Sequence, residues 1–256
     1  MRKHAALNSC MFAAVLLKLA LWQDVHDYLE KRTDVILPVG GTEQHGPSGP
    51  LGTDLIIAEE LANDLGEERR AMVAPAIPYG VSAVHSAFPG TIAVKPSTLL
   101  ALIEDAVDSL FSQGFRRFLI LNAHHGSTGT LQAACSEVHA KHPESRALSV
   151  QWWELPEVTS VLLEMFGARE GHHATPGELS VVRRFYPRAV IDLPPMERFE
   201  AVPQMAAWSA QDFRQRYPDG RVGSDPSLSS GHAGDSIFVA ASRGLVDVHR
   251  RLVEDP

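Results

Sequence analysis

Short apolar runs alternate with longer amphipathic stretches along most of this 256-residue chain. The runs are typical of buried strands, and the stretches between them have the spacing of helices with one apolar face. This alternation constrains the fold strongly, because strands separated by helices pair in parallel and are covered on both faces. The sequence therefore predicts one α/β domain with a mostly parallel sheet. The expected strands are 34–40, 71–80, 116–122 and 146–153, and the expected helices are 19–32, 54–65 (with Gly66 past its end), 98–113 (capped by Ser97), 127–142 and 175–187.

Composition excludes several classes of function. Hydrophobic residues make up 45% of the chain, which is enough for a large core. The net charge of −8 disfavours nucleic acid as a partner. Two cysteines, Cys10 and Cys135, make neither a disulfide framework nor a cysteine-type zinc site, so we expect a reducing, cytoplasmic location. The apolar runs are too short or too interrupted to span a membrane, so we expect no membrane partner.

The two ends of the sequence differ from its centre. The first 22 residues combine a basic start with an apolar stretch, as a secretion signal does. Lys18 interrupts this stretch, and no clear small-residue cleavage site follows. We therefore expect residues 1–17 to be an N-terminal extension and residues 18–256 to form the domain, with a secretion signal as the alternative. From about Ala201 the sequence is polar and rich in turns, which indicates a lid or a subunit interface.

The stretch GGTEQHGPSGPLGTD, residues 40–54, carries Glu43, His45 and Asp54 directly after the first expected strand. Glu43 and His45 are two residues apart, so in an extended segment they point the same way. Ligands of parallel sheets bind beyond the carboxyl ends of the strands. The nitrogen and carboxylate oxygens available there suit zinc, manganese or iron(II). The alternatives are a helix cap for Asp54 and a solvated Glu43.

Further candidates follow the third expected strand and precede the last expected helix. His124 and His125 lie in LNAHHGSTG at the same predicted edge of the sheet, where at least one would be a ligand. Glu178 lies in TPGE, where it either completes a capping box or turns toward a metal. His172 and His173 precede this helix and could supply a base, an acid or a substrate contact.

Together these motifs resemble the creatininase (creatinine amidohydrolase) family. LPVGGTEQHGPSGPLGTD is similar to the family pattern G-S/T-x-E-Q-H-G-P-H-L-P-L-x-T-D. The stretches YGVSAVHSAFPGTIAV, LNAHHGSTG, HATPGELS and GRVGSDPSLSSGHAG match further family motifs in the same order, over roughly residues 20–245. The resemblance implies a single three-layer α/β/α domain with a dinuclear metal site holding two divalent ions of zinc, manganese or iron. It also implies a homo-oligomer, and by family resemblance this would be a hexamer.

The resemblance assigns five metal ligands: Glu43 and His124 on one metal, His45 and Glu178 on the other, and Asp54 bridging both. Creatininase itself has a Glu two residues beyond its histidine ligand, where this chain has Gly126. His173 matches a family histidine that handles the substrate or a proton, so His173 and Glu178 are the catalytic candidates. The predicted substrate contacts are His85, His125, His172 and Trp153. For Trp153 and its neighbour Trp152, the alternative is a buried strand end.

The activity that the resemblance implies is a metal-dependent amidohydrolase. Its substrate would be a small molecule with a non-peptide C–N bond, either an amide or a cyclic amide. One alternative is a formamide deformylase or a small peptidase of the same family. Another is a binding protein, with or without metal, that lacks catalysis. The last alternative is motivated by Ser48, Ala123 and Ser127, which depart from the family pattern.

Overall fold

The computed structural model describes residues 15–197 and 208–254. At its centre lies a five-stranded sheet in the order β1–β3–β2–β4–β5, in which all neighbouring strands are parallel. The strands are β1 (Val15–Leu16), β2 (Asp34–Val39), β3 (Met72–Val73), β4 (Arg117–Asn122) and β5 (Arg146–Gln151). The prediction of a mostly parallel sheet is confirmed.

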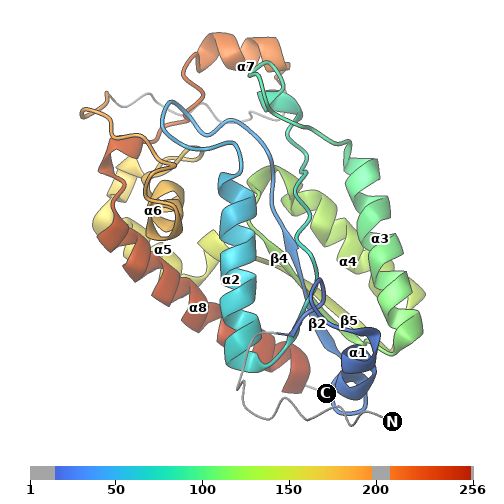
Figure 1. The fold of residues 1–256 in the computed structure, drawn as a ribbon. Helices are drawn as coiled ribbons and strands as arrows, with labels where there is room; N and C mark the ends of the chain where they lie inside the picture. The colour runs from blue at the N-terminus through green and yellow to red at the C-terminus, as the bar shows by residue number, and fades with distance from the viewer. Residues whose placement is uncertain (1–14, 198–207, 255–256) are drawn as a thin grey trace, which may run out of the picture.

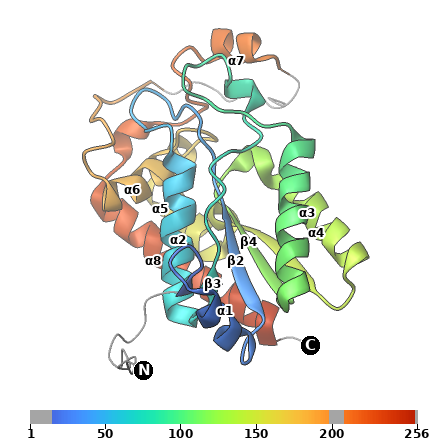
Figure 2. The same cartoon turned by 45° about the vertical axis from the view of Figure 1, so that its right-hand side comes forward.

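Helices cover both faces of this sheet, which gives the three layers of an α/β/α fold (Figure 1). One layer contains α2 (Thr53–Arg69), α5 (Pro156–Met165), α6 (Pro176–Phe185) and α8 (Gly231–Glu254). The other layer contains α3 (Pro96–Gln113) and α4 (Thr128–Lys141), with α1 (Trp22–Leu29) at its edge. The short helix α7 (Ala210–Arg216) lies away from these layers, at one end of the sheet (Figures 1 and 2).

Burial on both faces explains why the central strands are continuously apolar. All six residues of β2 are buried, and β4 is buried from Phe118 to Asn122. Side chains that alternate along these strands pack into two separate clusters. Ile36 joins the cluster beneath α2, α5, α6 and α8, whereas Val35 joins the cluster beneath α3 and α4. A sheet with one face in water has polar residues at every second position of its strands. Here helices cover both faces, so apolar residues can occupy successive positions.

Three local predictions are wrong. Gly66, expected past the end of a helix, lies buried inside α2, because burial outweighs its low helix propensity. Ser97, expected as a cap, lies inside α3, which begins at Pro96; proline is favoured at the first helical position. The strand expected over 71–80 is reduced to β3, because two prolines follow it and proline lacks the N–H that a strand donates.

The lid expected from about Ala201 is wrong for residues 231–254, and the alternative of a subunit interface stays a prediction. Residues 231–254 form α8, which packs against the core through Ile237, Ala241 and Leu245 at helical spacing. Residues 201–207 of the expected segment lie outside the described residues. At the other end, two residues of the expected N-terminal extension form β1, and residues 1–14 are not described. Among the helices that the structure describes, none is long and apolar enough to cross a bilayer.

The strand register brings two loops of the predicted site together. Val39, the last residue of β2, pairs with Asn122, the last residue of β4. The chain segments that follow these strands therefore leave the sheet side by side, at the edge where parallel sheets bind their ligands.

Candidate metal centre

The loop between β2 and α2 supplies three buried side chains with metal-binding atoms. Glu43, His45 and Asp54 are each at most 2% exposed, and one ligand atom of each lies within 4.8 Å of the others. Glycine permits this approach: a Cβ at Gly41 would lie 2.7 Å from Oδ2 of Asp54. The capping alternative for Asp54 does not hold, because Gly52 is the N-cap residue of α2 and Asp54 faces His45.

The contact between His45 and Asp54 lacks a hydrogen bond. Nε2 of His45 lies 3.0 Å from Oδ1 of Asp54 but forms no hydrogen bond in this geometry. Nδ1 of His45 lies 3.1 Å from the backbone oxygen of Glu43 and donates to it, which leaves Nε2 with a lone pair. In the described part of the chain, His45 Nε2 and Asp54 Oδ2 are among the buried atoms without a partner. A cation between them would satisfy both.

Without a metal, a proton takes the place of this cation. Burial disfavours charge on the imidazole, but the carboxylate of Asp54 outweighs it and raises the pKa of His45 to about 10. His124 shows the same behaviour: burial opposes its charge, and Glu43 raises its pKa. Both histidines therefore lie in places built for positive charge, which is the electrostatic requirement of a cation site.

His124 enters the site from the end of β4 and is held on several sides. Its backbone N–H donates to Oδ1 of Asn122 at 2.9 Å, and its Nδ1 lies 2.7 Å from Oγ of Ser127. Its Nε2 lies 2.9 Å from Oε2 of Glu43. Gly80 lies against the ring so closely that a Cβ there would overlap Nδ1. Ser127 is the N-cap residue of α4, but its hydroxyl bonds His124 and does not cap the helix.

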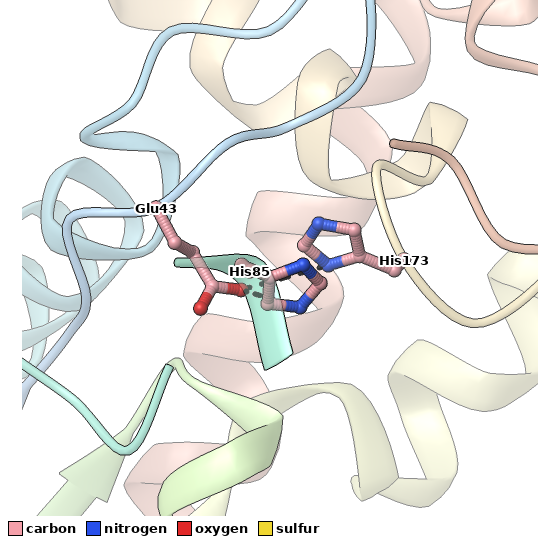
Figure 3. A group of neighbouring side chains, drawn as sticks. All are labelled: Glu43, His85 and His173. Carbon is pink, nitrogen blue, oxygen red and sulfur yellow. Dashed lines mark ion pairs between the residues drawn. The ribbon is translucent and has the colours of Figure 1, made fainter. Parts of the chain in front are cut away.

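A second group of side chains meets the other oxygen of Glu43 (Figure 3). Oε1 of Glu43 lies 3.5 Å from Nε2 of His85 and 3.6 Å from Nδ1 of His173. The two rings stack, with centroids 4.3 Å apart. Burial and the neighbouring imidazoles of His85 and His45 hold the pKa of His173 well below its usual range. Ala174, in a left-handed backbone conformation (φ 52°), turns the chain from His173 into α6.

Glu178 makes the contacts of a helix cap. Its Oε2 accepts the backbone N–H of Thr175 at 2.8 Å, and its own N–H donates to Oγ1 of Thr175 at 3.0 Å. The carboxylate also senses the centre: burial and Asp54 raise its pKa, while His45 lowers it. Glu178 belongs to neither of the two groups of candidate ligands around Glu43. The observed contacts are those of the capping alternative, and a ligand role remains a prediction.

The predicted substrate contacts divide into two places. His125 is exposed, and its ring centroid lies 5.8 Å from that of Trp153, which is half-buried. His172 is also exposed, and the two histidines are close enough for His172 to lower the pKa of His125, after burial and His124. His85 instead lies buried against Glu43. Trp152, the partner of Trp153 in sequence, is buried in the core, as its alternative predicts.

Sequence reasoning missed Gln44. Its side-chain nitrogen lies 2.9 Å from His85 Nδ1, from His173 Nε2 and from the backbone oxygen of Gly220. Its position between two candidate ligands was the available signal. The missing information was that residues 41, 129 and 176 positions further along the chain converge on it.

The site fits a divalent metal. Imidazole nitrogens and carboxylate oxygens are the donors that zinc and manganese accept, and two of these atoms lack any other partner among the described residues. Gly126, where creatininase carries a Glu, has no room for a side chain, because its Cβ would lie 2.7 Å from the backbone oxygen of Val81.

Comparison with known sequences identifies relatives. The family model described as creatininase, creatinine amidohydrolase, matches residues 19–249. The mycofactocin precursor peptide peptidase of Mycolicibacterium smegmatis is 40% identical over 106 residues, which are 39% of this chain and 42% of that protein. The creatinine amidohydrolase of Pseudomonas putida is 24% identical over 182 residues, which are 63% and 69% of the two chains. The match to the peptidase thus spans less than half of that protein's length.

Comparison with solved structures shows the fold. A zinc–zinc form of a creatininase mutant superimposes with a TM-score of 0.75 at 21% identity, over 95% of this chain and 99% of the other. A manganese creatininase gives a TM-score of 0.75 at 22% identity, over 95% and 100%. The three-layer α/β/α architecture is therefore shared over almost the whole length.

Proposed function

Because this chain belongs to the creatininase family, as its motifs indicated, we propose that it is a metal-dependent amidohydrolase with a dinuclear metal site. One observation carries the proposal above the others. His45 Nε2 and Asp54 Oδ2 are buried without hydrogen-bond partners, beside Glu43 and at the ligand-binding edge of a parallel sheet. Burying such atoms costs free energy unless something pairs with them, and a divalent cation does so.

The proposed ligand set follows the two sides of Asp54. Glu43 and His124 would hold one ion, His45 and Glu178 the other, and Asp54 both. The structures of creatininases with zinc and with manganese support either metal, and the donors here also suit iron(II). Two cations held by these residues would supply a water activated near neutral pH and would polarise an amide carbonyl.

The chain's own groups fix the ligands in place. The backbone oxygen of Glu43 and the hydroxyl of Ser127 bond the outer nitrogens of His45 and His124, so that the inner nitrogens face the carboxylates. His173 lies within 3.6 Å of Glu43 and is the candidate that passes a proton to the leaving nitrogen. The burial of these side chains keeps bulk water out, which strengthens each electrostatic contact.

Metal content in Asp54 variants tests the proposal. We expect about two ions per wild-type chain, purified without chelators and measured by mass spectrometry. Asp54→Ala should lose both ions together, because its carboxylate is shared, and hydrolysis should stop. Asp64→Ala, on the same helix but bonded to Ser242, is the control and should keep both ions. An Asp54→Ala protein that retains two ions and full turnover contradicts the bridged site.

Glu178 variants separate the ligand from the cap. Glu178→Gln keeps an oxygen that can accept from Thr175, and Gln serves in capping boxes. A loss of one ion in Glu178→Gln with unchanged melting temperature therefore supports the ligand role. If Glu178→Gln retains both ions and Glu178→Ala is less stable than wild type, Glu178 caps the helix and is not a metal ligand.

A second candidate is a small peptidase. The 40% identity to a precursor peptide peptidase favours it, and the same metal site would serve an amide bond in a peptide. Turnover of creatinine, lactams, formamides and short peptides by the metal-loaded protein separates amidohydrolase, deformylase and peptidase. Two bound ions without turnover of any of these would favour the non-catalytic alternative. A homo-oligomer remains a prediction that the sedimentation of the purified protein tests.

A further inference from the structure

Gln44 lies between two proposed metal ligands and is 5% exposed. Its amide nitrogen lies 2.9 Å from Nδ1 of His85, from Nε2 of His173 and from the backbone oxygen of Gly220. Its amide oxygen accepts the backbone N–H of Gly46 at 2.9 Å. An amide nitrogen has two hydrogens to donate, so these three contacts cannot all be hydrogen bonds that Gln44 donates.

The backbone partners fix which end of the amide is which. The N–H of Gly46 can only donate, so the atom facing it is the oxygen of Gln44. The carbonyl of Gly220 can only accept, so the atom facing it is the nitrogen. The amide orientation therefore follows from the hydrogen-bond network. Gly220 takes one hydrogen, and one remains for the two histidines.

His173 has another partner for the nitrogen that faces Gln44. Its Nε2 lies 2.8 Å from the backbone oxygen of Gln44, which can only accept. Nε2 of His173 therefore carries a proton and does not accept from the side chain. The second hydrogen of the Gln44 amide goes to Nδ1 of His85, which must have a lone pair.

The remaining nitrogens of the two rings then differ. A neutral imidazole carries one proton, so His85 carries it on Nε2 and His173 has a lone pair on Nδ1. These two nitrogens lie 3.5 Å and 3.6 Å from Oε1 of Glu43 (Figure 3). The rings stack with centroids 4.3 Å apart, a distance at which two positive charges would repel. The site thus presents a donor and an acceptor side by side.

We propose that Gln44 is a positioning residue that fixes opposite roles for these two histidines. His85 donates a hydrogen bond from Nε2 to the oxygen of the reacting carbonyl, and His173 accepts a proton at Nδ1. His85 is therefore not a metal ligand, although its Nε2 lies close to Glu43 and His173 in a ligand-like group. The proposal rests on the hydrolase function proposed above.

The proton count of the reaction closes with these roles. Water adds to the carbonyl carbon, and one of its protons moves to Nδ1 of His173. The hydrogen bond from His85 stabilises the negative charge on the carbonyl oxygen without transferring its proton. The C–N bond then breaks, and the proton on His173 moves to the leaving nitrogen. The products are a carboxylic acid and an amine, and His173 returns to its starting state.

Nitrogen NMR of the zinc-loaded, full-length protein tests this assignment. Protein labelled with ¹⁵N in histidine shows which ring nitrogen carries the proton, and spectra of His85→Asn and His173→Asn identify the two signals. We expect both rings to carry the proton on Nε2 at neutral pH. A proton on Nδ1 of either ring overturns the proposal, and this wild-type measurement decides even if the Gln44 variants below fail to fold.

Gln44→Glu removes both hydrogens that the side chain of residue 44 donates, to Nδ1 of His85 and to the oxygen of Gly220, and keeps the backbone contact with His173. An oxygen would then face Nδ1 of His85, so the proton of His85 should move from Nε2 to Nδ1. His173 should not change, because its partner is the backbone oxygen of residue 44. The control Gln151→Glu adds the same charge at a buried glutamine bonded to Ser149, and should leave both rings unchanged. An unchanged His85 in a folded Gln44→Glu protein overturns the role of Gln44.

Kinetics and metal content add an independent readout. Loss of one donor to the carbonyl oxygen lowers kcat by about 10²–10³. We expect such a decrease in Gln44→Glu, with KM and metal content close to wild type. A change in KM alone contradicts the positioning role. Wild-type protein without bound metal or turnover would refute the proposed function, whereas the NMR result still decides the proton positions.

Discussion

Substitution of Gly41 by alanine offers a quantitative test of how tightly the metal centre is packed. An added Cβ would lie 2.7 Å from Oδ2 of Asp54 and 3.2 Å from the ring of His124. Ordinary contacts begin at 3.4 Å, so the Asp54 oxygen must move by about 0.7 Å (3.4 minus 2.7). Functional groups need to be held within about 0.5 Å of their working geometry. The shift exceeds this tolerance at the residue proposed to bridge both ions.

We therefore expect Gly41→Ala to fold but to lose metal. Overpacking of this size costs about 1–3 kcal/mol of stability, which most single domains tolerate. The matched control is Gly52→Ala in the same loop, where an added Cβ would meet no described atom within 4 Å. The control changes the N-cap of α2, which costs at most about 1 kcal/mol, but it leaves Asp54 in place.

The assay is metal content and thermal denaturation of both variants beside wild type. The expected result is fewer bound ions in Gly41→Ala and wild-type occupancy in Gly52→Ala. Full metal occupancy in Gly41→Ala would refute the reasoning, because it would mean that Asp54 can move by this distance without leaving the ions. Equal metal loss in both variants would also refute it, since the loop rather than the contact would then be responsible.

Three further predictions concern groups around this centre. In metal-free protein, Asp54 raises the pKa of His45 from 6.5 in the unfolded chain to about 10 in the folded protein, against the effect of burial. The stabilisation by Asp54 is therefore complete below pH 6.5 and lost as the pH rises through about 10. Urea denaturation from pH 6 to pH 10 should show this decline in the free energy of unfolding, and His45→Gln should flatten it. Burial raises the pKa of Glu170 from 4.5 to about 8. Glu170→Gln should therefore match the wild-type melting temperature below pH 4.5 and exceed it above pH 8, and a lower melting temperature at pH 9 would contradict this. Ala174→Gly relieves backbone strain of about 1 kcal/mol but loses a buried methyl group worth about 0.8 kcal/mol, so calorimetry should show little change in stability. Steady-state kinetics should show a lower kcat, because the backbone no longer holds His173 in place.

The features that the sequence predicted best are those encoded locally. The apolar runs that became β2 and β4 and the capping box at Thr175 follow from neighbouring residues alone. The motif from 40 to 54 also encodes its own loop, in which glycines allow the carboxylate and imidazole groups to approach. The structure brings Glu43, His45 and Asp54 together as this motif suggests.

The features that sequence reasoning missed depend on contacts between segments that are distant in the chain. Whether a helix continues through Gly66 depends on the burial of this residue in the fold, because glycine is tolerated where packing outweighs propensity. The apolar face of α8 was not recognised in the sequence, because serines and glycines lie between its buried residues. Ser127 is the N-cap residue of α4, and only the position of His124 shows that its hydroxyl does not cap the helix.

The proposed ligands come from three stretches of chain, at residues 43–54, at His124 and at Glu178, so they are separated by up to more than half of the domain. In the unfolded chain the three stretches are not held together around one ion, so binding free energy adds to folding free energy. At an ion concentration one hundred times the dissociation constant, linkage adds about 2.7 kcal/mol. A cell that runs short of the metal would therefore lose folded protein as well as activity. The abundance of this protein would report on metal supply.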